Sequence, residues 1–148
     1  MNADWTDIAV PIKDRIMAYV EYYGGGVSFA ELRRRMPDFR SEDPPKGFAI
    51  GEWDRNVLIW LGMSRAASAA ISELVEENKI YFKSTSLLVY FVDGLTLQLP
   101  LAKPGIRKYK SQRWLPVAIY PVTSNTMRQN RKTAGVAGTK SQKIGGSA

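Results

Sequence analysis

The sequence predicts an α+β fold in which helices come first, a small antiparallel sheet follows, and a basic flexible tail ends the chain. Apolar residues recur at helical spacing in residues 11–23 and 65–78. β-prone residues and turn signals dominate residues 79–99. With 148 residues, 45% of them hydrophobic, the chain is long enough for one globular domain with modest extensions.

The first predicted helix covers residues 11–23, with Pro11 suited to the first helical position. One apolar face contains Ile12, Ile16, Tyr19, Val20 and Tyr23. Three consecutive glycines, residues 24–26, end it.

A second helix is expected at about residues 29–36, because Ser28 and Glu31 have the spacing of a capping box and Pro37 closes the segment. Leu32 and Met36 should face inward. The run Arg33–Arg35 is then either a solvated helix face or a contact for phosphate groups.

Residues 37–53 contain several prolines and glycines and are expected to form a loop or insertion. Asp54 is expected to cap a short apolar helix at residues 57–61 that stops at Gly62. Ser64 caps the next helix, residues 65–78, whose buried stripe is Ala67, Ala70, Ile71, Leu74 and Val75. The other face, Arg65, Ser68, Ala69 and Ser72, is small enough to approach a DNA groove closely.

Strands are expected at residues 79–83, 87–92 and 95–99, joined by a turn at Ser84–Ser86 and by an Asp93-Gly94 hairpin. Residues 114–122 predict one more extended segment. Pro116 and Pro121 should confine it to a sheet edge or to a strap across the core.

The charge is divided sharply along the chain. Residues 1–93 contain 11 Lys/Arg and 14 Asp/Glu, whereas residues 94–148 contain 10 Lys/Arg and no acid. Five cations and Tyr109 lie in residues 103–113, the basic segment, which Trp114 follows. Cations can neutralise phosphates while aromatic rings stack on bases. A solvated tail, kept soluble by its charge, is the alternative interpretation.

Several function classes are excluded or disfavoured by composition. The chain has no cysteine and no histidine, so thiol catalysis and Cys-ligated metal sites are impossible and the commonest neutral-pH base is missing. We therefore expect no enzyme, no cofactor and no metal site. No apolar run reaches the ~20 residues that cross a bilayer, and the first residues lack a secretory pattern. We expect a cytoplasmic protein that does not bind membranes.

The stretches GGVSFAELRRRMP and LGMSRAASAAISELVEENKIYF carry a resemblance to winged helix-turn-helix domains, covering residues 11 to about 99. The first resembles the entry to the second helix, and the second resembles a recognition helix running into the wing. This resemblance implies binding of double-stranded DNA by the recognition helix, with wing residues on the DNA backbone. The implied contacts are Ser64, Arg65, Ser68, Ala69, Ser72, Lys83 and Ser84.

The resulting hypothesis is a nucleic-acid-binding protein in transcription regulation or replication, with duplex DNA favoured over RNA. Its affinity should come from the basic segment and the tail, through Lys103, Arg107, Lys108, Tyr109, Lys110, Arg113, Arg128, Arg131 and Lys132. The predicted units are a winged-helix-like domain at 1–102, a segment at 103–122 and a low-complexity tail at 123–148. Alternatives are a protein-assembly module whose tail folds on a partner, or an RNA or ribonucleoprotein binder. A homodimer or a larger complex fits each of these.

Overall fold

The computed structural model describes residues 4–42, 46–123 and 140–144, and the protein is α+β. Its described helices are α1 (Ile12–Tyr23), α2 (Phe29–Arg35), α3 (Arg65–Glu76) and α4 (Leu87–Asp93), with a short 3-10 turn, η1 (Trp53–Arg55). Its described strands are β1 (Val27–Ser28), β2 (Gly47–Glu52), β3 (Val57–Met63), β4 (Ile80–Ser84), β5 (Arg113–Trp114), β6 (Val117–Pro121) and β7 (Lys140–Ile144).

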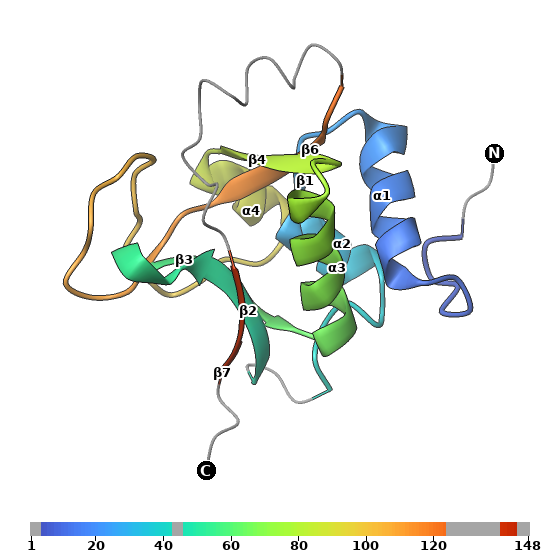
Figure 1. Cartoon of the computed structure of the whole chain (residues 1–148), viewed down its shortest axis with the longest axis horizontal. Helices are drawn as coiled ribbons and strands as arrows, with labels where there is room; N and C mark the ends of the chain where they lie inside the picture. The colour runs from blue at the N-terminus through green and yellow to red at the C-terminus, as the bar shows by residue number, and fades with distance from the viewer. Residues whose placement is uncertain (1–3, 43–45, 124–139, 145–148) are drawn as a thin grey trace.

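The strands form two small sheets. One has the order β1-β6-β4 and is antiparallel throughout. The other has the order β5-β3-β2-β7, in which only the β3–β5 pair is parallel. In Figure 1 the three-stranded sheet lies above the four-stranded one, α3 lies in front, and α1 covers the right-hand side.

An aromatic core joins the two sheets. Trp60 of β3 lies 6.1 Å from the Phe29 ring of α2 and 5.4 Å from the Tyr90 ring of α4. Trp114 of β5 packs edge-on against Tyr90 at 5.0 Å, and its indole N–H donates to the carbonyl of Ile59. Burial of these large rings supplies much of the stabilisation of the fold.

Three of the four helices predicted before residue 79, those at 11–23, 29–36 and 65–78, are confirmed, and local capping explains why. Gly24 ends α1 in the left-handed conformation, with φ of +74°. The hydroxyls of Ser28 and Ser64 accept hydrogen bonds from the backbone N–H groups of Glu31 and Ala67, so both act as N-caps. The carboxylate of Glu31 accepts a hydrogen bond from the Tyr19 hydroxyl instead of completing the capping box.

The short helix predicted at residues 57–61 is wrong, and so is the assignment of all of 37–53 to a loop. Residues 47–52 and 57–63 form the antiparallel pair β2–β3, with Ile50 opposite Trp60. Asn56, at φ of +60°, closes the turn between them. A short, fully buried apolar run has the same pattern in a helix and in a strand, so periodicity could not separate the two.

The strands predicted at 87–92 and 95–99 are also wrong. Residues 87–93 form α4, whose first turn is capped by the Ser86 hydroxyl. Gly94, at φ of +90°, ends this helix and is not part of a hairpin, and residues 95–99 have no regular structure. The Tyr90 hydroxyl donates to the Val117 carbonyl and accepts from the Phe29 N–H, so tertiary contacts override the β propensity of this run.

The segment at 114–122 forms strands, but its predicted position at an edge or as a strap is wrong. β6 lies between β1 and β4, in the centre of its sheet. Pro116 precedes the strand and Pro121 is its last residue, so neither proline interrupts the hydrogen-bonded ladder. In the predicted tail, residues 140–144 pair with β2 as β7.

Candidate nucleic-acid interface

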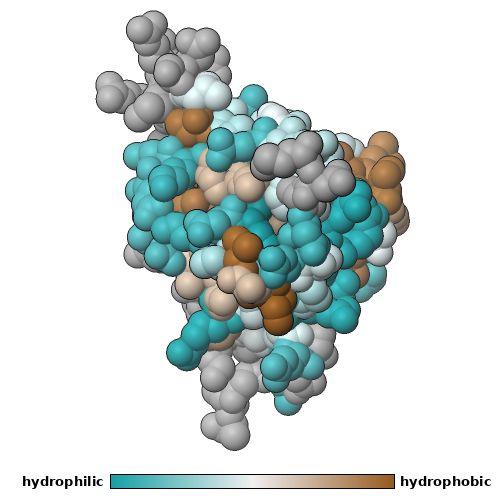
Figure 2. Space-filling model, turned by 90° about the vertical axis from the view of Figure 1, so that its right-hand side faces the viewer, coloured by the Kyte–Doolittle hydropathy of each residue, from teal (hydrophilic) through white to brown (hydrophobic). Residues whose placement is uncertain are grey.

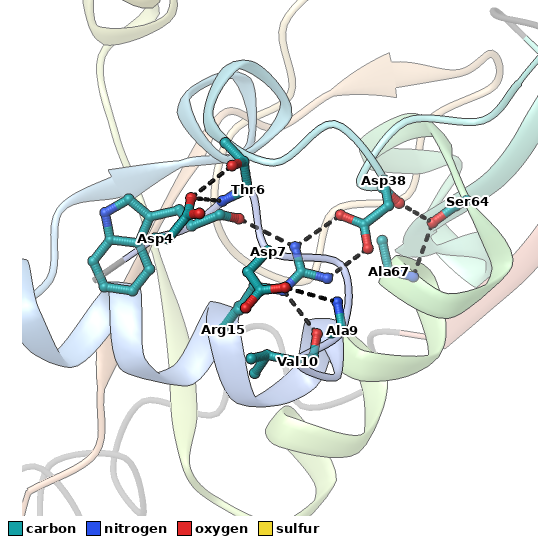
Figure 3. A network of polar contacts seen from close by, with 10 residues as sticks. Asp4, Thr6, Asp7, Ala9, Val10, Arg15, Asp38, Ser64 and Ala67 are labelled. Atoms are coloured by element: carbon teal, nitrogen blue, oxygen red, sulfur yellow. Dashed lines mark hydrogen bonds and ion pairs between the residues drawn. The ribbon is translucent and has the colours of Figure 1, made fainter. Parts of the chain in front are cut away.

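The N-terminus of α3 is held by a partly buried polar network (Figure 3). The Ser64 hydroxyl caps α3 and also donates to the carbonyl of Asp38, 2.8 Å away. The Arg15 guanidinium of α1 binds the Asp38 carboxylate through two hydrogen bonds, of 2.8 and 2.5 Å. These bonds fix the start of α3 against α1, so Ser64 serves the fold.

Arg15 also binds the N-terminal segment. Its Nε donates to the Val10 carbonyl at 2.9 Å and its Nη1 donates to the Trp5 carbonyl at 3.2 Å. Hydrogen bonding to Arg15 lowers the pKa of Asp38 below its usual value. Sequence reasoning missed this residue, because its partners are brought together only by the fold.

Two of the five residues predicted on the reading face of α3 are fully available. Arg65 and Ala69 are exposed. Ser68 is buried, which corrects its prediction as a DNA contact, because β2 and β7 pack against α3. Ser72 is half-buried, and its hydroxyl oxygen has no hydrogen-bond partner within the described residues.

Arg65, on the predicted groove-reading face of α3, also lines one of two surface hollows. Its guanidinium lies over the Phe48 ring of β2, 5.6 Å from the centroid. A hollow of about 1300 Å³ in front of α3 is lined by Arg40 and Arg65 but also by Asp38 and Glu42. A second hollow, of about 480 Å³, shares Arg40 and lies beside α2; it is lined also by Arg33, Arg34 and Asp93. Carboxylates in both hollows reduce their attraction for anions.

The basic segment is ordered by a second buried arginine. Arg55 of η1 donates from Nε to the Arg107 carbonyl at 2.8 Å and from Nη2 to the Lys103 carbonyl at 3.1 Å. Its Nη1 bonds the buried carboxylate of Glu52. The Arg55 guanidinium thus fixes the backbone of the basic segment against η1 at two residues.

Tyr109 supplies further anchors for the basic segment. Its hydroxyl accepts the Lys103 N–H at 2.9 Å, and its carbonyl accepts from the Asn56 side chain at 2.7 Å. The Arg113 guanidinium lies over the Tyr109 ring, 4.8 Å from its centroid. Half-buried Tyr109 therefore has a structural role on one side, and Arg113 covers its ring.

The other cations of the basic segment remain available. The side chains of Lys103, Arg107, Lys108 and Lys110 are exposed, and none has an ion pair with a described residue. No carboxylate occurs in the sequence after Asp93. Figure 1 shows this part of the chain as the orange loop that extends at the left of the molecule. These four exposed cations are therefore suited to an anionic partner such as a phosphate backbone.

Lys83 and Ser84, predicted as wing contacts, lie at the end of β4 and are exposed. The Lys83 ammonium lies 5.1 Å from the Tyr120 ring centroid, so part of its charge is engaged by an aromatic face. Arg128, Arg131 and Lys132 lie outside the described residues.

Comparison with protein-family models, with curated proteins and with solved structures found no match. In the described part of the chain no helix combines the length and apolar character needed to cross a membrane. The expectations that the chain is not an enzyme and needs no cofactor or metal stay predictions, as does the division at residues 102 and 122.

Proposed function

We propose that this protein binds double-stranded DNA, with the basic segment supplying affinity and the first turn of α3 supplying sequence preference. The observation that carries the proposal is a set of four exposed cations that form no ion pair with a described residue, on a backbone held by Arg55. A role in transcription regulation or replication and a cytoplasmic location belong to the same proposal.

The cations of the basic segment are preorganised, because Arg55 holds the backbone that carries them. Cations on a fixed backbone meet phosphates without the entropy cost of ordering a loop, and each neutralised phosphate releases counterions. Residues 1–93 carry a net charge of −3, because 11 cations face 14 acids. Most of the attraction for DNA must therefore come from the part of the chain that follows Asp93.

The order of elements supports a winged-helix core for this function. α1, α2 and α3 precede the antiparallel strands β4 and β6, and the basic segment lies in the connection between those strands. This connection is where a wing would lie. The β2–β3 hairpin would then be an insertion between α2 and α3, and α4 part of an enlarged wing.

Within α3, Arg65 is the side chain best suited to read a base. A bidentate contact to guanine gives about 1–3 kcal/mol of discrimination, more than the roughly 0.5–1 kcal/mol of an exposed cation–π contact such as that with Phe48. We expect Arg65→Ala to reduce the affinity difference between preferred and random duplexes while leaving the salt dependence almost unchanged. Selection of duplexes from a random pool, followed by fluorescence anisotropy, measures both. An unchanged preference contradicts this role, and Arg40→Ala is the matched control.

The proposed function is tested with the full chain, because truncation after residue 102 would remove the central strand β6. Binding to labelled duplex DNA, duplex RNA and single strands is measured by anisotropy from low to high salt. Tightest binding to duplex DNA, weakening steeply with salt, is expected. Tighter binding to RNA would favour a ribonucleoprotein role, and no binding to any of them at low salt contradicts the proposal.

A second candidate function is self-association through α4. Leu88, Phe91 and Val92 are exposed on one face of this helix, and a two-fold axis would place identical apolar faces together. In contrast, Figure 2 shows that hydrophilic residues cover most of the face that carries α1. Sedimentation equilibrium of the wild type and of Phe91→Glu distinguishes the candidates. A concentration-dependent dimer lost in the variant supports self-association, and a wild-type monomer contradicts it.

A further inference from the structure

The basic segment ends in a tip formed by residues 104–106. The carbonyls on both sides of this tip, those of Lys103 and Arg107, bind the same guanidinium of Arg55. Gly105 has φ of +127°, and a Cβ added there would meet no atom within 4 Å. The tip therefore projects away from the described protein while its base is clamped.

Ile106 is 93% exposed, the most exposed of the large apolar side chains in the described residues. A side chain with so little contact contributes almost nothing to packing. It is directly followed by Arg107 and Lys108, and Lys103 lies on the other side of the tip. An isolated apolar side chain thus stands between cations on a clamped turn.

We propose that Ile106 inserts between base pairs from the minor groove and bends the bound duplex; this inference rests on the proposed DNA binding. Apolar wedges on minor-groove proteins unstack a base step and kink DNA in this way. The minor groove, about 6 Å wide, admits a narrow turn but not a helix. Cations on both sides of the tip are suited to the phosphates of the two strands that border the groove.

The same chemistry would suit an anionic membrane less well. Membrane association scales with the apolar area that is buried, and one isoleucine side chain buries far less area than the acyl chain that by itself binds membranes only marginally. In this tip only Ile106 is a large apolar residue, because Pro104 and Gly105 precede it. The clamped backbone also restricts the tip to one shape, which suits insertion at a single base step.

The test measures bending separately from binding. A duplex of about 25 base pairs carries a donor and an acceptor at its ends, so that bending raises energy transfer. A second duplex contains 2-aminopurine, whose fluorescence increases on unstacking. The full chain is compared with Ile106→Ala, with the rescue variant Ile106→Leu, and with Val10→Ala, a control at an exposed aliphatic residue outside the basic segment. Thermal unfolding checks that all four are folded.

We expect the wild type, Ile106→Leu and Val10→Ala to bend the duplex at saturation. Ile106→Ala should lose most of the energy-transfer change while its Kd changes less than about threefold, since the phosphate contacts remain. Binding without any bend by the wild type, or an equal bend by Ile106→Ala, overturns the insertion while leaving the proposed function intact. Absence of wild-type binding overturns both. Co-sedimentation with anionic phospholipid vesicles measures membrane binding. Vesicle binding that depends on Ile106, without bending of DNA, also overturns the proposal.

Discussion

Two buried arginines hold two loops in the same way, but the loops have opposite charge. Arg15 binds one carboxylate and the carbonyls of Trp5 and Val10. Arg55 binds one carboxylate and the carbonyls of Lys103 and Arg107. The N-terminal segment held by Arg15 carries acids, whereas the basic segment held by Arg55 carries only cations.

In both loops, the groups that order the backbone differ from the charged side chains that remain exposed. In both regions the guanidinium is buried and donates to two backbone carbonyls as well as to one carboxylate group. At the N-terminus the loop's own acids are exposed, and Asp4 accepts hydrogen bonds from Thr6 while Asp7 accepts one from the Ala9 N–H. In the basic segment the ordering is done by Arg55, so the cations of Lys108 and Lys110 remain exposed and unpaired with described residues.

The largest expected effect is that of Arg55→Ala. The Glu52 side chain is only 9% exposed, so removing Arg55 leaves a buried charge without compensation. Loss of one partner from a buried pair costs about 3–5 kcal/mol. Urea unfolding measures this loss, and the double variant with Glu52→Gln should recover part of it. A decrease of less than about 1 kcal/mol in the free energy of unfolding would contradict the conclusion that Arg55 holds the basic segment in place.

Arg15→Ala should destabilise the protein less, by about 1–3 kcal/mol, because the hydrogen-bond acceptors it leaves are closer to water. The Asp38 side chain is 35% exposed, so water can replace much of what Arg15 provides. The same urea measurement compares the two variants directly. If Arg15→Ala lowers the free energy of unfolding more than Arg55→Ala does, the burial of the paired carboxylate does not set the size of the effect.

The stabilisation that the Arg15–Asp38 pair provides should also depend on pH. Because Arg15 lowers the pKa of Asp38, this carboxylate stabilises the fold above its usual pKa, and the stabilisation is lost as pH falls through the depressed value. The unfolding free energies of wild type and Asp38→Asn should therefore differ most near neutral pH and converge as the pH falls below the depressed pKa of Asp38. A difference that stays constant over this range would show that Asp38 acts without its charge.

Tyr109→Phe gives the smallest expected effect. It removes the hydroxyl that accepts the Lys103 N–H, at an exposed site. The stability change should be about 0.5–1.5 kcal/mol. Hydrogen exchange at the Lys103 amide is the sharper readout, because protection there should fall while protection in β6 stays. Equal protection of this amide in both proteins would show that the Tyr109 hydroxyl is not the group that protects it.

Features with a local cause could be predicted from the sequence. Ser28 and Ser64 cap their helices through residues three positions away, and Gly24 ends α1 through its own backbone freedom. The accumulation of cations after Asp93 is a property of composition. None of these depends on which distant segments meet.

Features created by distant contacts could not be predicted. Arg55 binds carbonyls 48 and 52 residues further along the chain, and no sequence spacing signals such a pair. Ser68 is buried because β2 and β7 pack on α3, although its position on the helix predicted exposure. Residues 87–93 favour strands locally but form α4 around buried Tyr90.

The most direct test of the account is the slope of log Kd against log salt for a DNA duplex, measured for the wild type and for the triple variant Arg107→Ala, Lys108→Ala, Lys110→Ala. These side chains are exposed, so the variant should fold as the wild type does. If each cation neutralises one phosphate, the slope should become shallower by about 2.7. The matched control replaces Arg33, Arg34 and Arg35 of α2 by alanine and should change the slope less. An unchanged slope in the basic-segment variant, with a shallower one in the α2 variant, would contradict the assignment of affinity to the basic segment.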